Sequence, residues 1–485
     1  MSEFCFRIPI PWKLSSHHVT SIFVVGLDGI PLPCKVMIDR ESAAAAHGPI
    51  VHVARNRDES GRVYFVYSLL ARGEMLLCTG TLPVQELAYD LLKELARGTI
   101  NRLRNQLSIW EEGGLIVSDK VRQTVAQAIG LLARAIMSDN PVEQDQMAAA
   151  AIELGVDAIF ELSTVFGQQI SQYRLAQPGL SRFWMANTAG HGDQRLPSLA
   201  QGDFNLVRLN DCWATGDTPA TNPSDSRRKI VGPWLDASAG GISDLLQDTV
   251  GHLERRSVLL KACRAGLEGL TEDVALIQLV GGLNGIGHRH LSYPQQLQLT
   301  IDLLQLADES LVELPVMVSF DFPWGERLAG AVGGIHPLQI ADTLLRQGIR
   351  ISYFGLEINL DYWPGGSVIR DPLQWIDLID TWAQLELPLV LCLRVPSGGQ
   401  PVPADQPVDR RVNQQRSNVT EQQRLDFLKV VLPMMVARPI VHGIIWSQWQ
   451  DSDDDRFPHG GLVDANGNPK PVAAVITQLR QLIQD

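Results

Sequence analysis

The sequence predicts an α/β fold: a (β/α)8 TIM barrel preceded by an N-terminal β-rich module and a helical arm. The main observation is that residues 181–485 contain eight apolar runs of strand length. Near-continuous apolar runs are typical of strands buried on both faces, as in a parallel sheet. Amphipathic segments separate most of these runs, and eight strands with helices over about 300 residues match the size of such a barrel.

The expected barrel strands occupy residues 183–187, 204–209, 229–235, 274–280, 316–320, 352–358, 389–395 and 442–447. Between them, Asp371 followed by Pro372 is a typical helix start, because Asp caps the first turn and Pro fits its first position. Residues 472–483 repeat apolar side chains at helical spacing and predict the last helix. Residues 214–228 have no helical pattern, so we expect an irregular second crossover.

Residues 1–82 predict a β-sandwich-like module. Short runs rich in Val, Ile, Phe and Tyr alternate there with Gly, Pro and Asp. We expect this module to pack against the rest of the chain, and whether it also binds a partner stays open.

Residues 83–180 predict a helical subdomain. Leucines and isoleucines from Leu87 to Leu107 recur at helical spacing, with Arg97, Arg102 and Arg104 on the other face. Two more amphipathic segments follow, at residues 121–137 and 143–173. The arginines resemble a nucleic-acid-binding helix, but acidic neighbours and the lack of interleaved aromatic residues favour a solvated or interdomain face.

Composition excludes several classes of partner. The net charge of −13 argues against nucleic acid, whose phosphates demand clustered Lys and Arg. No window approaches 18 consecutive apolar residues, so we expect no membrane span and no membrane partner. The first residues do not read as a signal peptide, and the six cysteines are scattered without a CxxC pair, so we expect a reduced, cytoplasmic protein without a cofactor. The oligomeric state is not predicted.

The predicted carboxyl ends of the strands are rich in Trp, Asp and Glu, and that end of a barrel carries catalytic groups. We interpret Glu357, Asp321 and Glu326 as candidate catalytic carboxylates. The candidate substrate-binding residues are Trp213, Trp324, Asn359, Trp363, Trp446, Trp449 and Asp451. Glycoside cleavage needs two carboxyl groups, one protonated and one ionised, and flat aromatic side chains suit sugar faces. The alternative is that single tryptophans only close the barrel end.

Two segments could suggest a metal, but we predict none. The acidic run at residues 451–455 lacks the alternating Asp spacing of a calcium loop and is better read as a solvated loop. His288 and His290 lie in a glycine-rich segment without a nearby pair of carboxylates, which argues against zinc.

Several segments resemble family 10 glycoside hydrolases, the endo-β-1,4-xylanase family. The most specific is VHGIIWSQWQDSDDDRFPHGGLVDANGNPKPV, which resembles that family's eighth strand and its tail. FNLVRLNDCW resembles the second strand and YFGLEINL the sixth. The combination of arm and barrel looks like the family 10-like proteins of planctomycete bacteria. The resemblance implies a TIM barrel that acts on a β-linked saccharide.

The catalytic glutamates implied by the resemblance are missing. Gly281 and Gly282 stand where the family has its Asn-Glu pair after strand 4. Leu393, followed by Arg394, stands where the family has its nucleophile after strand 7. Glu357 and Asn359 replace the Gln and His of the sixth strand.

The chemistry has therefore either moved or been lost. Glu357 and Asp321 or Glu326 would lie on adjacent strands, spaced ~4.8 Å apart, which allows the close carboxyl pair of a retaining enzyme. The alternative for Glu357 is a structural ion pair with Arg394 or another cation. Two functions remain open: a xylanase-like glycoside hydrolase acting on β-linked poly- or oligosaccharide, or a carbohydrate-binding or scaffolding pseudoenzyme.

Overall fold

The computed structural model describes most of the chain. The described residues are 2–9, 12, 14, 16–39, 48–176, 183–188, 204–209, 228–233, 235–236, 252–284, 293–310, 313–330, 335–398, 414–415, 419–452 and 457–484. No helix among them is long and apolar enough to cross a membrane.

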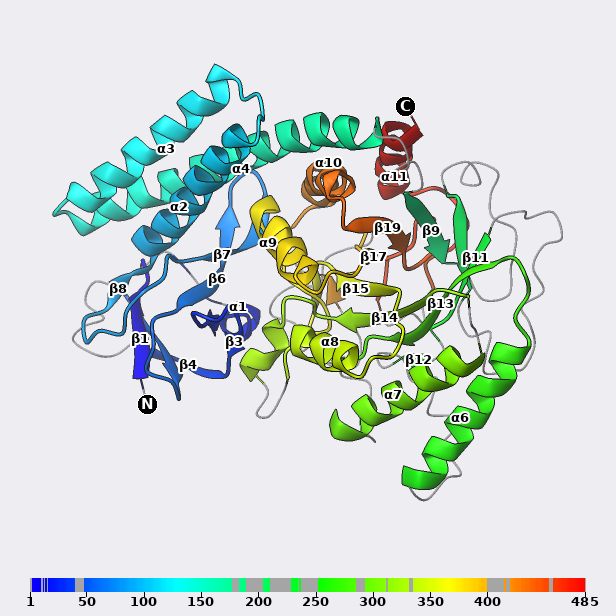
Figure 1. Ribbon diagram of the computed structural model, residues 1–485. Helices are drawn as coiled ribbons and strands as arrows, with labels where there is room; N and C mark the ends of the chain where they lie inside the picture. The colour runs from blue at the N-terminus through cyan, green and yellow to red at the C-terminus, as the bar shows by residue number, and fades with distance from the viewer. Residues whose placement is uncertain are drawn as a thin grey trace.

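A closed barrel of eight parallel strands forms the carboxy-terminal part of the chain (Figure 1). The strands in order are β9 (Trp184–Thr188), β10 (Leu206–Leu209), β11 (Arg228–Val231), β13 (Val274–Gly281), β14 (Val316–Asp321), β15 (Tyr353–Asn359), β17 (Leu389–Arg394) and β19 (Val441–Trp446). β19 pairs back with β9 and closes the barrel. All eight predicted runs supply a barrel strand, so the (β/α)8 prediction is confirmed.

Further elements surround the barrel strands. The short strand β12 (Leu235–Asp236) also pairs with β13, and β16 (Tyr362–Trp363) pairs with β18 (Gln414–Gln415). The helices that follow strands are α6 (His252–Glu268), α7 (Tyr293–Ser310), α8 (Pro337–Arg346), α9 (Pro372–Ala383), α10 (Glu421–Ala437) and α11 (Pro471–Gln484). The expected irregular crossover at residues 214–228 lies outside the described residues, apart from Arg228.

Helix α9 begins as its sequence predicts. The Asp371 side chain accepts a hydrogen bond from the Gln374 amide at 3.1 Å, and Pro372 occupies the first helical position. Asp371 has a second role that the sequence does not reveal. Its carboxylate is fully buried and pairs with both terminal nitrogens of Arg102 on the arm.

The amino-terminal residues form two four-stranded sheets. One contains β1 (Ser2–Arg7), β4 (Cys34–Asp39), β5 (Ile50–Arg55) and β8 (Tyr89–Asp90), and the other contains β2 (Phe23–Val25), β3 (Pro31–Leu32), β6 (Arg62–Leu69) and β7 (Gly73–Cys78). Helix α1 (Ser16–Thr20) lies before β2. Phe4 and Phe6 on β1 are fully buried, whereas Cys5 between them is only partly covered. This alternation gives the first sheet one core face and one outer face.

Three helices follow, as predicted: α2 (Leu91–Glu112), α3 (Asp119–Met137) and α4 (Pro141–Leu175). The helical pattern was extended too far at its start. Leu87 is 78 % exposed, and Tyr89 with Asp90 forms the edge strand β8 beside β1, so the helix begins only at Leu91. In Figure 1, α4 runs from the arm across the barrel side toward α10 and α11.

The β-rich module, the arm and the barrel share one apolar core. Phe160 on α4 packs edge-on against Phe427 on α10, and the Leu76 amide of β7 donates to the Ile369 carbonyl at 2.8 Å. The Arg174 guanidinium on α4 donates to the carbonyl of Arg438, which follows α10, and to that of Val441, the first residue of β19. The division into residues 1–82, 83–180 and 181–485 as separate units stays a prediction.

Candidate functional site

A ring of polar side chains lies inside the barrel near the carboxyl ends of the strands. Below it the interior is apolar, with side chains such as Leu206, Leu276 and Met317 in contact. The ring, which we call the polar ring, consists of Arg208, Gln278, Ser319, Asp321, Glu357, Asn359 and Arg394. Parallel strands place their carboxyl ends at one edge, and this edge carries the active sites of TIM barrels.

Two hydrogen bonds show that these side chains face the barrel interior. Arg208 on β10 donates to the Gln278 side-chain oxygen on β13 at 3.2 Å, although β11 lies between these strands. Gln278 in turn lies 3.5 Å from Glu357 on β15, across the intervening β14. Contacts between strands that are not neighbours can form only through the interior.

Glu357 is the centre of the polar ring. Its Oε1 accepts hydrogen bonds from the Gly282 amide at 2.8 Å and from the Ser319 hydroxyl. The side chain is half-buried, whereas Gln278 and Ser319 are fully buried. Hydrogen bonds donated to a carboxylate stabilise its ionised form. Glu357 therefore presents a hydrogen-bond acceptor at the inner edge of the barrel.

Asp321 is a direct neighbour of Glu357 but is tied into the protein. The two residues are in register on β14 and β15, as the sequence predicts for adjacent strands. Asp321 is only 2 % exposed, and its Oδ1 accepts from the Phe322 amide at 3.0 Å and from the Asn359 amide at 3.2 Å. The Arg394 guanidinium in turn donates to the side-chain amide oxygen of Asn359 at 3.0 Å. Asn359 thus links Arg394 to Asp321, and a structural ion pair of Glu357 stays an open alternative.

The guanidinium groups of Arg208 and Arg394 and the carboxylate of Glu357 all influence the pKa of one interior side chain, the Cys392 thiol. Burial raises the pKa of the Cys392 thiol to about 12, Arg208 and Arg394 oppose that rise, and Glu357 adds to it. Cys392 faces the interior, and the three charged groups lie close enough to influence its thiol. The polar ring can therefore both donate to and accept from a ligand rich in hydroxyl groups.

Gly282 and Leu393, which stand where the resembled family has glutamates, face different parts of the barrel. Gly282, after β13, turns its backbone amide toward Glu357. Leu393 packs in the layer between barrel and helices, while its neighbours Cys392 and Arg394 belong to the interior side. The inward-facing side chain at the end of β17 is thus Arg394 and not Leu393.

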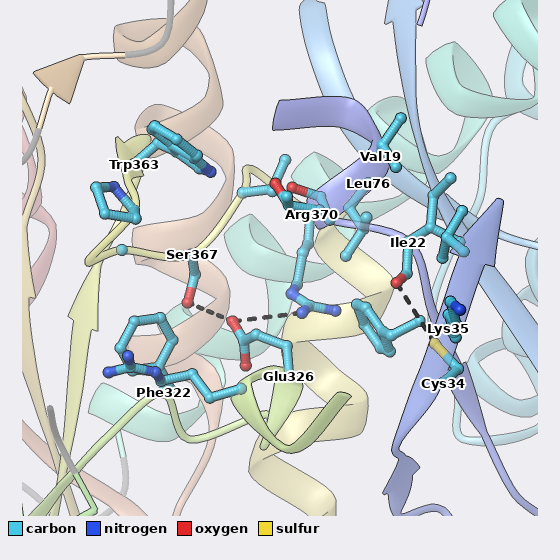
Figure 2. Close-up of a pocket in the computed structure, with 18 residues that line it drawn as sticks. Val19, Ile22, Cys34, Lys35, Leu76, Phe322, Glu326, Trp363, Ser367 and Arg370 are labelled. Carbon is cyan, nitrogen blue, oxygen red and sulfur yellow. Dashed lines mark hydrogen bonds and ion pairs between the residues drawn. The ribbon is translucent and has the colours of Figure 1, made fainter. Parts of the chain in front are cut away.

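Glu326 and Trp363 lie in a different place from Glu357. They line a cavity of about 460 Å³ between the amino-terminal sheets and the loops that follow β14 and β15 (Figure 2). Glu326 accepts from the Ser367 hydroxyl at 2.6 Å and lies 3.5 Å from an Arg370 nitrogen. These contacts favour Asp321 over Glu326 as the possible partner of Glu357. We call this space the junction cavity.

Backbone geometry explains this separation. Phe322 and Gly325 both have positive φ, and a Cβ at Gly325 would lie 2.3 Å from the His336 ring. Only glycine permits that close approach, and the turn sends the following 3-10 helix η2 (Glu326–Gly330) against β2, β3 and β4. Glu326 follows the turn away from the barrel axis.

The remaining candidate tryptophans have structural surroundings. Trp324 is edge-on to Trp375 and lies under the Arg370 guanidinium, 4.6 Å from its centre. Trp446 is fully buried, with its indole nitrogen donating to the Gly460 carbonyl, so it offers no face to a sugar. Trp449 is 7 % exposed, which also argues against stacking. Trp213 lies outside the described residues.

Asp451 forms a clamp and not an open site. Its carboxylate accepts from the Lys470 ammonium at 2.7 and 2.9 Å and from the Gly461 amide at 2.8 Å. Burial raises the pKa of Asp451, but hydrogen bonds from His459 and Lys470 outweigh it and hold the pKa below its ordinary value. The pair holds the loop after β19 against the start of α11.

Some members of the polar ring do not stand at the predicted strand ends. Arg208, Gln278 and Ser319 lie inside the apolar runs and not after them. Their signal was available, because every second residue of a barrel strand faces the interior and these polar residues alternate with apolar ones.

Comparison with known proteins adds little to this geometry. No protein-family model matches the sequence, and no curated protein matches it. Among solved structures, xylanase 10B from Thermotoga maritima is 11 % identical over 65 % of this chain and 98 % of its own, with a TM-score of 0.44. The endo-1,4-beta-xylanase XylE of Penicillium canescens is 12 % identical over 65 % of this chain and 97 % of its own, also with a TM-score of 0.44. At these values the similarity assigns no residue and no substrate, and the barrel rests on its own strand order.

Proposed function

We propose that this protein binds a β-linked, xylan-type oligosaccharide at the carboxyl end of the barrel and does not cleave it. The observation that carries the proposal is Glu357, a half-exposed carboxylate among buried donors and two guanidinium groups. Sugar hydroxyls both donate and accept hydrogen bonds, so they suit this mixture. The class of ligand comes from the resemblance of the eighth-strand tail to family 10 glycoside hydrolases.

The absence of cleavage follows from the protonation that hydrolysis needs. One of two carboxyl groups must carry a proton to protonate the leaving oxygen. Within the described part of the polar ring the carboxyl groups are Glu357 and Asp321, and both are already engaged as acceptors of hydrogen bonds from protein groups. Asp321 is also too buried to reach a glycosidic oxygen.

A second candidate function is hydrolysis by Glu357 together with Asp321. Their register on adjacent strands favours it, since strand spacing of ~4.8 Å is compatible with the ~5–5.5 Å between the carboxyl groups of a retaining pair. Cleavage would require Asp321 to leave Asn359 and turn toward the substrate.

The two functions are separated by measuring binding and product together. Xylo-, gluco- and manno-oligosaccharides are titrated calorimetrically into the wild type, Glu357→Gln and the matched control Glu326→Gln, and each mixture is then chromatographed. We expect saturable binding that Glu357→Gln weakens and Glu326→Gln does not, with every oligosaccharide recovered intact. Products that need Glu357 would establish hydrolysis instead, and no binding to any saccharide would reject both functions.

A further inference from the structure

The outer face of the amino-terminal sheet brings three potential metal ligands together. Glu3 and Cys5 lie two residues apart on β1 and so project from the same face. His52 on β5 is directly opposite Cys5 in the antiparallel register. The ligand atoms of these three residues all lie within 4.8 Å of one another. This site is remote in sequence from the polar ring and belongs to a different sheet.

The distances fit one cation surrounded by the three residues. His52 Nδ1 lies 3.4 Å from the Cys5 sulfur and 3.4 Å from Glu3 Oε2. For tetrahedral zinc with ordinary bond lengths, the sulfur–nitrogen edge is roughly 3.6 Å and the nitrogen–oxygen edge roughly 3.4 Å. The nitrogen–oxygen separation is also longer than the ~2.7–3.2 Å of an ordinary N–H···O hydrogen bond.

Both contacts involve the same ring nitrogen. A catalytic relay would use one imidazole nitrogen for the thiol and the other for the carboxylate. Here Nδ1 faces both partners, so the three ligand atoms converge on one point. We propose that Glu3, Cys5 and His52 bind a zinc ion, with water in the fourth position.

The metal-free state is a different arrangement of the same groups. Without a metal, the Cys5 sulfur lies 3.4 Å from His52 Nδ1, a distance compatible with a weak hydrogen bond that uses the thiol proton. Zinc requires the thiolate and therefore releases this proton on binding. The ion would join β1 to β5 and add to the stability of the folded chain, since a ligand of the native state alone stabilises it.

The test uses the full-length protein, stripped of metal with a chelator. Zinc affinity is measured by competition with a chromogenic chelator for the wild type, Cys5→Ser, His52→Asn and the matched control Cys34→Ser. Cys34 is likewise a partly buried free cysteine of this sheet, but its sulfur faces the Ile22 carbonyl at 3.8 Å and, among the described side chains, no histidine. We expect at least a tenfold loss of affinity in the first two variants and none in Cys34→Ser.

Cobalt substitution provides a second readout. Co²⁺ bound to a thiolate gives a sulfur-to-metal charge-transfer band, which should be present in the wild type and in Cys34→Ser and absent in Cys5→Ser. Circular dichroism of each variant verifies that the fold is retained. A wild type that binds no zinc at micromolar concentration, or a folded Cys5→Ser that binds it as tightly as the wild type, would overturn the proposal.

Discussion

Glu357 lies near the end of one barrel strand and Glu326 follows the neighbouring strand, yet the two residues have different surroundings. Glu357 is directed to the barrel interior, where it accepts from a backbone amide and a hydroxyl. Glu326 lies in the junction cavity beside Ser367 and Arg370, facing the amino-terminal sheets (Figure 2). The difference shows that a carboxylate after a barrel strand belongs to the site only if the backbone keeps it above the barrel axis.

The largest expected effect is a loss of stability when the buried ion pair between the arm and helix α9 is broken. Arg102→Met leaves the fully buried Asp371 carboxylate without its guanidinium partner, which we expect to cost about 3–5 kcal/mol. Chemical denaturation of both proteins measures this difference. Arg346→Met is the control, because its partner Asp342 lies in an exposed pair one helical turn away, and we expect under about 0.5 kcal/mol. Equal losses of unfolding free energy in the two variants would show that the contact between the arm and α9 does not depend on the buried pair.

At the rim of the barrel, Asp451→Asn should lower the free energy of unfolding by about 2 kcal/mol at pH 7, since it removes charge-assisted hydrogen bonds from Lys470. The pKa of Asp451 is lower in the folded protein than in the unfolded chain, where it is near ~3.9. The stabilisation from its carboxylate is therefore complete above the unfolded pKa and is lost as the pH falls through the folded pKa. Denaturation at a series of pH values should show the difference between variant and wild type narrowing below about pH 4. A constant difference would contradict the clamp.

In the polar ring, Asn359→Ala tests whether Asp321 is held as a structural group. The substitution removes the amide that joins Arg394 to Asp321, and we expect a loss of about 1–2 kcal/mol from the unmet buried groups. Asn468→Ala, on an exposed turn, should change the free energy of unfolding by less than about 0.5 kcal/mol. An unchanged unfolding curve for Asn359→Ala would show that Asn359 does not hold Asp321 in place, and this would favour a catalytic role for Asp321.

The smallest effect concerns affinity. Glu357→Gln keeps the shape of the side chain but removes its charge, and we expect about tenfold weaker oligosaccharide binding, or roughly 1.4 kcal/mol. Glu326→Gln should leave that affinity within about twofold, because Glu326 lines the junction cavity. Calorimetric titration of both variants compares the two sites directly. The reverse order of effects would place the saccharide in the junction cavity.

The barrel was predictable because its strands are buried on both faces and leave apolar runs in the sequence. Glu357, Asp321 and Asn359 could be selected as candidates because they end such runs. Trp446 was selected in the same way, but the alternation along β19 indicates another direction: Ile445 faces the interior, so Trp446 faces the helices. Attention to that alternation would also have identified Arg208 and Gln278.

Other features have no local signal. The Arg102–Asp371 pair joins residues 269 positions apart, and no periodicity in either segment indicates its partner. The direction of Glu326 depends on positive φ at Phe322 and on the close approach of Gly325 to His336. The convergence of Cys5 with His52 depends on the register between β1 and β5. These contacts follow from how whole elements pack, which a pattern of neighbouring residues does not encode.

A crystal structure of the protein with a xylo-oligosaccharide tests the central claim most directly. The account predicts an intact chain at the carboxyl end of the barrel, with a sugar hydroxyl within hydrogen-bonding distance of the Glu357 carboxylate and Asp321 still bound to Asn359. A cleaved product beside Glu357, or an oligosaccharide seated in the junction cavity with the polar ring empty, would contradict it.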